Sequence, residues 1–210
     1  PMPAVPMLEA QDLTARRGDA TLFSGLGFAV QSGKVLVVTG PNGTGKTTLL
    51  RILAGLTLPA AGTIQWRGET IAQHAAQLRE ETLYAGHLTA LKDELTAEEN
   101  LRSLVSLSGI EPDEAALRAA LAAVALDAQR VLPARVLSQG QRRRIGLARL
   151  SLLSRPLWLL DEPATALDAT GLGLLGRLIA RQLAAGGAVI AATHQPLDLP
   201  PDAVDRLVLA

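Results

Sequence analysis

Three apolar runs along the chain alternate with segments of helical periodicity. The first run, KVLVVTG at residues 34–40, is rich in β-branched residues, and a helical pattern follows it after Gly45. The runs PLWLLDEP at 156–163 and GGAVIAATH at 186–194 flank a helical segment at 171–187, whose closing glycines suit a C-cap. Apolar strands that alternate with helices predict an α/β fold with a mostly parallel sheet covered on both faces.

The middle of the chain has a different pattern. From Thr96 to about Ala128 it holds alanine- and leucine-rich helical segments and no strand signal. Thr96 and Glu99 have the spacing of a capping box, which predicts a helix from there to about Ser108, before Gly109.

The start of the chain predicts a third kind of structure. Its first 30 residues read as short strands with turns, which we expect to form an antiparallel layer. We therefore predict a single domain, residues 1–210, with a core at about 7–84 and 151–210. A helical lobe at about 85–150 is inserted into that core.

Composition and charge narrow the class of protein. The chain has 210 residues, 48% apolar and 19% charged, which is the balance of a globular protein with one substantial core. Twenty basic residues offset twenty acidic ones, so we expect no nucleic-acid partner. The absence of cysteine excludes disulfides, thiolate metal sites and cysteine nucleophiles. We expect neither a signal peptide nor a membrane-spanning helix, because the N-terminal residues lack a basic start and charges interrupt the longest apolar run.

Residues 40–47, GPNGTGKT, match the phosphate-loop pattern GxxxxGK[ST] between a predicted strand and a predicted helix. In this pattern backbone N–H groups turn toward phosphate oxygens, and the helix adds the positive end of its dipole. We expect Lys46 to reach the terminal phosphates and the Thr47 hydroxyl to ligate Mg²⁺. A chance match is the alternative, and the flanking elements argue against it. The candidate nucleotide-binding residues are Gly40, Pro41, Asn42, Gly43, Thr44, Gly45, Lys46, Thr47 and Thr48.

The apolar run LWLLDE, residues 157–162, ends in two adjacent acids. A buried strand that ends at Asp161 suits Mg²⁺ coordination, with water between the ion and the carboxylate. Glu162 is placed to orient or deprotonate an attacking water. The alternative is that the acids only end a strand before Pro163, and it loses weight beside a phosphate loop. We therefore predict hydrolysis with Glu162 as the base.

The segment LSQGQRRR, residues 137–144, opens another predicted helix. Ser138 as N-cap and Gln141 form a capping box, and Gly140 leaves the backbone accessible, so this helix start is a second candidate anion site. An ordinary capped helix is the alternative, and three arginines commonly form a solvated face. Positive charge in the first turns of a helix opposes the helix dipole, however. This arrangement is destabilising unless an anion or an acidic partner lies near.

The order of these motifs resembles the ATP-binding-cassette (ABC) family over nearly the whole chain: GPNGTGKT, LSQGQ, LWLLDEP, TALD and a histidine after a strand. The resemblance implies a head-to-tail dimer, in which Ser138 and Gly140 of one subunit close over ATP on the phosphate loop of the other. It also implies that Asp168 lies in the loop linking the two sites and that His194 contacts the γ-phosphate. A structural role for His194 is the alternative.

Within that family the chain resembles the CcmA family, the ATPase subunits of the CcmAB system for c-type cytochrome maturation. The segments that carry the likeness are LYAGHLTALKDELTAEENL, RRRIGLARL, LWLLDEPATALD and ATHQPL. The likeness implies ATP and Mg²⁺ as cofactors and a haem-transporting ATPase of the translocase class. It also implies docking on a CcmB-like permease and associated CcmC- and CcmD-like proteins at the cytoplasmic face of the inner membrane, where hydrolysis drives release of a haem-loaded chaperone. Three histidines and no cysteine leave few axial ligands, so we expect no direct haem binding.

Three positions depart from the general ABC pattern. His87 stands where most relatives carry a glutamine that contacts the Mg²⁺ region and relays its state to the membrane partner, and a histidine would have to be neutral to do so. We expect His87 to serve coupling more than chemistry, with a loop histidine of no role as the alternative. Near Arg16 and Arg17 many relatives stack an aromatic ring on adenine, and the guanidinium of Arg17 can stack instead with weaker base selectivity. Gln139 replaces the usual glycine.

Other functions stay open on the sequence alone. One is an ABC ATPase that acts as a soluble scaffold for iron–sulfur assembly, and another is the ATPase subunit of a different ABC exporter. A third is a small-molecule phosphate-loop kinase, which the second anion site disfavours. A transport motor is the leading hypothesis, because the motifs occur in order and the middle of the chain is CcmA-like.

Overall fold

The chain divides into two compact units. The computed structural model describes residues 5–86 and 91–210 and, within residues 72–75, the backbone alone. A sheet unit comprises residues 1–87, 155–163 and 179–210, and a helical unit comprises residues 88–154 and 164–178. Helix α6 (Ala169–Ala184) begins in the helical unit and ends in the sheet unit.

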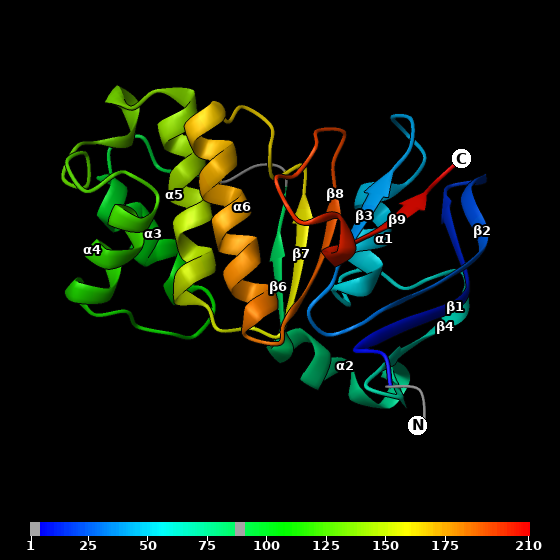
Figure 1. The fold of residues 1–210 in the computed structure, drawn as a ribbon. Coiled ribbons are helices and arrows are strands. Elements are labelled where there is room, and N and C mark those ends of the chain that lie inside the picture. The colour runs from blue at the N-terminus through cyan, green and yellow to red at the C-terminus, as the bar shows by residue number, and fades with distance from the viewer. Residues whose placement is uncertain (1–4, 87–90) are drawn as a thin grey trace. The chain divides into compact units, whose positions relative to one another are not determined.

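A five-stranded parallel sheet forms one layer of the sheet unit. Its strands are, in order, β6 (Thr82–Ala85), β7 (Leu157–Asp161), β8 (Ala188–Ala192), β3 (Val35–Thr39) and β9 (Val204–Val208) (Figure 1). Every residue of β7 and β8 is buried, as near-continuous apolar strands require in a parallel sheet covered on both faces. The three strands predicted from the apolar runs are confirmed. Because all five strands run in one direction, their carboxyl ends meet at one edge.

A four-stranded antiparallel sheet forms the second layer of this unit, which confirms the antiparallel layer predicted near the N-terminus. Its strands are, in order, β2 (Ala20–Val30), β1 (Leu8–Arg17), β4 (Ala61–Trp66) and β5 (Glu69–Thr70). Helix α1 (Lys46–Leu53) shares one hydrophobic core with both sheets. Leu13 of β1, Leu49 of α1 and Val38 of β3 are completely buried in that core. The helix that follows the phosphate loop is therefore held from two sides.

Helices α3 (Ala97–Ser106), α4 (Glu114–Ala123) and α5 (Gln139–Leu152), with a short 3₁₀ turn η1 (Ala134–Val136), lie in the helical unit (Figure 1). Leu101, Leu117 and Ile145 from the three helices are fully buried. The capping box predicted at α3 is confirmed: the Glu99 N–H donates to the Thr96 hydroxyl at 3.1 Å, and the Thr96 N–H donates to the Glu99 carboxylate at 2.8 Å. The helix ends at Ser106, earlier than predicted, because a turn follows it.

Several short elements had no clear sequence signal. They are β4, β5, helix α2 (Ile71–Glu81), β6, the 3₁₀ turn η2 (Pro201–Ala203) and β9. Strand β6 has only four residues, and pairing with the buried strand β7 accounts for it. Within the described residues, no helix combines the length and apolar character needed to span a bilayer.

Candidate nucleotide-binding site

The phosphate loop joins β3 to α1 at the carboxyl edge of the parallel sheet. The side chain of Lys46 is buried, and its ammonium donates to the carbonyls of Gly40 at 2.7 Å and Pro41 at 3.0 Å. The Thr44 hydroxyl also donates to the Pro41 carbonyl, at 3.0 Å. Gly45, the N-cap of α1, makes no side-chain capping bond. The first turn of α1 therefore offers its backbone N–H groups to an anion, and the Lys46 ammonium adds a positive charge beside them.

Two loop positions require glycine on steric grounds. Gly40 has φ of 145°, and a Cβ there would overlap the Leu209 carbonyl oxygen. Gly45 has φ of 96°, and a Cβ would lie 3.0 Å from the Leu22 Cβ and 3.2 Å from the Phe23 ring. Only glycine combines these backbone angles with such close neighbours.

Thr47 and Asp161 meet although 114 positions separate them in the sequence. The Thr47 hydroxyl donates to Asp161 Oδ2 at 2.8 Å, and Asp161, the last residue of β7, is only 3% exposed. Hydroxyl and carboxylate oxygens are ligands that Mg²⁺ accepts, and Mg²⁺ bound by one or two protein ligands keeps waters and phosphate oxygens. The pair therefore suits Mg²⁺ bound together with a nucleotide. Among the side chains that the structure describes, no three or more His, Cys, Asp or Glu are arranged to hold a metal.

Glu162 and His194 lie at the same edge, after β7 and β8. His194 Nε2 is 3.6 Å from Glu162 Oε1, and the side chains are 47% and 22% exposed respectively. The Glu162 N–H donates to the Ala192 carbonyl at 2.8 Å. Glu162 has φ of 49°, in the left-handed region that non-glycine residues seldom adopt. Such strain collects at functional sites, where the surrounding structure enforces it.

Tyr84 on β6 is a neighbour of this edge that the sequence did not single out. Burial raises the pKa of its hydroxyl, the negative charge of Asp161 raises it further, and Arg51 opposes the rise. The phenol is therefore held in its protonated form near the buried carboxylate. The sequence offered little signal for Tyr84, because the pairing of β6 with β7 is a tertiary contact.

The second motif forms the start of α5 in the helical unit. Its predicted capping box is confirmed: the Gln141 N–H donates to the Ser138 hydroxyl at 3.2 Å, and the Ser138 N–H donates to Gln141 Oε1 at 2.9 Å. Arg142 contacts Asp93 at 2.6 Å, which supplies the acidic partner that the helix dipole argument requires.

Arg144 has an acidic partner of its own, Asp168. Their contact is 2.9 Å, and Asp168 also accepts the Gly171 N–H at 2.8 Å. The Gly171 N–H and the Arg144 guanidinium together hold the pKa of Asp168 below its usual value, against a smaller opposing effect of burial. Acidic side chains of the chain itself therefore accompany two of the three arginines.

The candidate residues divide between the two units. The sheet unit holds the phosphate loop with Asp161, Glu162, His194 and Arg17, and the helical unit holds Ser138, Gly140, Gln141 and Asp168. His87 lies outside the described residues.

The position of Arg17 is compatible with nucleotide contact. It is exposed at the end of β1, opposite Ala20. Its neighbour Arg16 donates to the Asp19 carbonyl at 3.3 Å and is thereby tied into the turn. Of the two arginines, Arg17 is therefore the better placed for the base contact that the sequence predicts.

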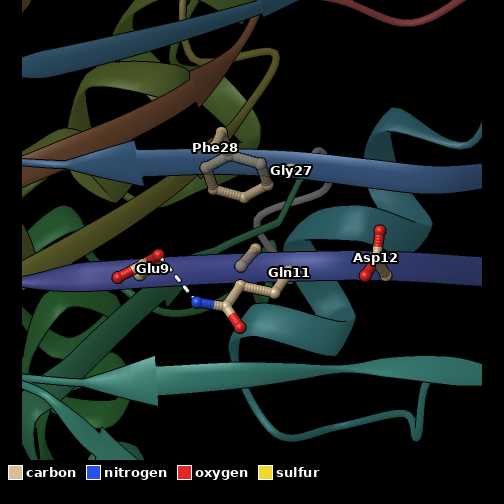
Figure 2. A pocket seen from close by; sticks show the side chains of 6 residues that line it. Glu9, Gln11, Asp12, Gly27 and Phe28 are labelled. Carbon is tan, nitrogen blue, oxygen red and sulfur yellow. Dashed lines mark hydrogen bonds between the residues drawn. The ribbon is translucent and has the colours of Figure 1, made fainter.

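An open hollow on the antiparallel sheet is a poor candidate for the same ligand. Glu9, Gln11 and Asp12 of β1 and Gly27 and Phe28 of β2 line it, and Gln11 donates to Glu9 at 2.8 Å (Figure 2). Two carboxylates at its rim repel a polyphosphate. The phosphate loop therefore remains the stronger candidate for the nucleotide site.

Comparisons with known proteins agree with this geometry. The family model described as ABC transporter matches residues 23–165. An ABC transporter ATP-binding protein from Pyrococcus furiosus has a similar solved structure, with a TM-score of 0.79 and 25% identity over 95% of this chain and 96% of that one. The fold, the phosphate loop and this match define the ATPase subunit of an ABC transporter, a class that binds nucleotide and hydrolyses ATP.

Curated relatives show to which family within the ABC ATPases the chain belongs. The chain is 47% identical to "Cytochrome c biogenesis ATP-binding export protein CcmA" of Nitrosospira multiformis, over 98% of this chain and 100% of that protein. It is 50% identical to the protein of the same name from Aromatoleum aromaticum, over 96% of each chain. The chain belongs to the CcmA family of ABC ATPases.

Proposed function

We propose that this chain is the ATP-hydrolysing motor subunit of a CcmAB-type complex for c-type cytochrome biogenesis. In that complex it energises release of a haem-loaded chaperone, as a haem-transporting ATPase of the translocase class. The contact between Thr47 and Asp161 carries the ATPase part, because it brings the phosphate loop and the acidic strand end together at one edge. The cytochrome part is supported by relatives named for cytochrome c biogenesis that match along nearly their whole length.

The residues of the sheet unit have separate roles in hydrolysis. Lys46 neutralises the terminal phosphates, and the N–H groups of the loop and of α1 hold their oxygens. Glu162 orients and deprotonates the attacking water. His194 orients the Glu162 carboxylate from 3.6 Å and contacts the γ-phosphate. Arg17 stacks on the base through its guanidinium plane.

Thr47 and Asp161 would hold a Mg²⁺ ion that arrives with ATP, Asp161 through water. When bound, the ion supplies positive charge that offsets the charge developing on the phosphate oxygens. The Thr47 hydroxyl donates to Asp161 Oδ2 at 2.8 Å, so the two oxygens that would hold the ion lie close together.

The residues of the helical unit serve a second copy of the chain. In the head-to-tail homodimer, Ser138 and Gly140 of one subunit close over the ATP held by the other. Both residues reach solvent at the start of α5, so a partner's nucleotide has access to them. Asp168 lies in the loop between β7 and α6 and links the two sites.

The membrane partners are a CcmB-like permease and associated CcmC- and CcmD-like proteins. The subunit binds them peripherally at the cytoplasmic face of the inner membrane, and His87 couples the ATP site to them. If coupling is its role, His87→Ala reduces cytochrome maturation more than basal hydrolysis, and equal loss of both would contradict it.

Replacing the base tests the ATPase assignment. Glu162→Gln removes the carboxylate and keeps its size, so ATP binding should persist while hydrolysis falls by about a thousandfold. Binding is measured with a fluorescent nucleotide and hydrolysis by phosphate release. Undiminished hydrolysis in this variant would show that another group is the base.

Deleting the gene in the source organism tests the cytochrome assignment. We expect membranes of the deletion strain to lose covalently bound haem in a haem stain, and the wild-type gene to restore it. Normal c-type cytochromes would refute this part and leave the ATPase assignment intact. Co-purification with soluble iron–sulfur assembly proteins, and with no membrane subunit, would favour the scaffold function instead.

A further inference from the structure

Loop 163–168 connects the proposed base to α6, and its backbone is held in an uncommon conformation. Glu162, directly before it, has φ of 49°, and Ala166 within it has φ of 62°. The Leu167 N–H closes a turn on the Ala164 carbonyl at 3.2 Å. Left-handed conformations at non-glycine residues persist only where surrounding contacts enforce them. Within the helical unit, the contacts of Ala166 and Asp168 with α5 supply such enforcement.

Arg144 of α5 contacts this loop within the helical unit. Its Nη2 donates to both carboxylate oxygens of Asp168, at 3.1 and 2.9 Å. The Arg144 side chain is only 12% exposed, whereas that of Asp168 is 58% exposed. The Arg144 Nε is buried with no hydrogen-bond partner among the described residues, so the guanidinium depends on Asp168 for charge compensation.

The backbone of the same loop passes over the first turn of α5. A Cβ at Gly140 would lie 3.5 Å from the Ala166 carbonyl oxygen. Asp168 also caps α6, because its Oδ1 accepts the Gly171 N–H at 2.8 Å. One carboxylate therefore joins the start of α5 to the start of α6.

We propose that Arg144 is a positioning residue, which holds Asp168 and so sets the conformation of the loop that follows Glu162. This inference rests on the proposed ATPase function. Arg144 touches no substrate, and it acts through Asp168 and the five residues between Asp168 and Glu162. Loss of Arg144 leaves ATP bound but allows the loop to relax, and the base then loses its orientation.

Purified full-length variants test this assignment. Arg144→Met should lower kcat by about tenfold or more while the Kd for ATP stays within about twofold, because small misplacements of a catalytic group are costly. Asp168→Asn keeps the cap oxygen and removes the charge, and the double variant should be no worse than the more severe single one. Arg144→Lys should restore most of the rate, because one nitrogen makes both contacts.

Arg118 provides the matched control. It pairs with Asp127 at 3.1 Å in the same unit, but the side chains are 63% and 46% exposed. Arg118→Met removes an exposed ion pair and should leave kcat within about twofold of wild type.

Hydrogen exchange gives a readout that does not need hydrolysis. Arg144→Met should speed exchange of the Leu167 and Gly171 amides, and Arg118→Met should not. Wild-type kcat or unchanged exchange in a folded Arg144→Met protein overturns the inference. The inference is also overturned if kcat of the Arg144→Met, Asp168→Asn double variant falls by the product of the two single losses.

Two other outcomes, a variant that does not fold and a wild-type protein that does not hydrolyse ATP, have a different meaning. If Arg144→Met does not fold, Arg144→Gln replaces it with the same expected and contrary results. If the wild-type protein fails to hydrolyse ATP, the proposed function fails, while the exchange result still decides whether Arg144 holds the loop.

Discussion

The chain contains two helix starts that are candidate phosphate sites, and they are built in opposite ways. At α1 the N-cap is Gly45, which makes no side-chain capping bond, and Lys46 lies buried beside the loop carbonyls. At α5 the N-cap Ser138 and Gln141 form a complete capping box. Carboxylates of the same chain also accompany Arg142 and Arg144 there.

The difference shows that a helix start is not equally available to an anion in the two places. The first turn of α1 keeps its N–H groups and its positive charge for a ligand. The α5 start satisfies one N–H with its own cap and neutralises much of its charge within the chain. Two features of the α5 start remain available to an anion: the hydroxyl of the exposed Ser138, and the backbone at Gly140, which no side chain covers. The difference supports the proposal that α1 is the main phosphate-binding helix start and that α5 closes over a phosphate held by a second subunit.

Removing the buried lysine is expected to have the largest effect. Lys46→Ala takes away the centred charge at α1, so ATP affinity and hydrolysis should each fall by about a hundredfold or more. Lys92→Ala, which removes an exposed lysine of the helical unit, is the control. Nucleotide titration measures the affinity. If Lys46→Ala binds ATP with an affinity close to that of wild type, the proposed contrast between the two helix starts is wrong.

Adding a methyl group at the second helix start is expected to separate recognition from stability. A Cβ at Gly140 lies at an ordinary contact distance of 3.5 Å from the Ala166 oxygen, so Gly140→Ala should fold. Alanine is a better helix former, so the free energy of unfolding should stay equal or rise by up to about 1 kcal/mol. Hydrolysis should nevertheless fall by about tenfold, because the methyl group obstructs a phosphate. Thermal melts and phosphate release measure the two effects, and a wild-type rate would mean that no ligand approaches Gly140.

The capping box of α3 tests whether Ser138 does more than cap a helix. Thr96 and Ser138 make the same local hydrogen bonds, so each alanine variant should lose about 1 kcal/mol of folding free energy. Only Ser138→Ala should also lower the hydrolysis rate at saturating ATP. Equal rates in the two variants would reduce the α5 start to an ordinary capped helix.

The smallest expected effect concerns acid stability. The Thr96 backbone N–H and hydroxyl lower the pKa of Glu99 from its ordinary 4.5, whereas Gln141 in the α5 box does not titrate. The unfolded chain then takes up the proton first, so this contribution is present above about pH 4.5 and is lost as the pH falls through the lower folded value. Glu99→Gln should weaken the acid dependence of the free energy of unfolding. Urea titrations between about pH 5 and 3 measure it, and an unchanged slope would contradict the role of the carboxylate.

Local motifs account for what could be predicted well. The strands 35–39, 157–161 and 188–192 and both capping boxes follow from patterns within ten residues, because burial on both faces and capping geometry are local demands. Short elements such as β6 and β9 have too few residues for a periodicity signal, and pairing with neighbours stabilises them. Tyr84 was missed for the same reason, because its relation to Asp161 depends on the neighbouring strand.

The sequence by itself determined the phosphate loop, the acidic strand end, the order of the motifs and hence the family. Each of these depends on residue types at fixed short spacing, such as glycines that admit positive φ and a lysine one position later. Only the tertiary structure decided which partners these groups have. It brought Thr47 to Asp161 and Arg144 to Asp168, and it showed that two arginines of α5, Arg142 and Arg144, pair with the chain's own carboxylates. Such contacts join residues far apart along the chain, and packing of whole elements selects them.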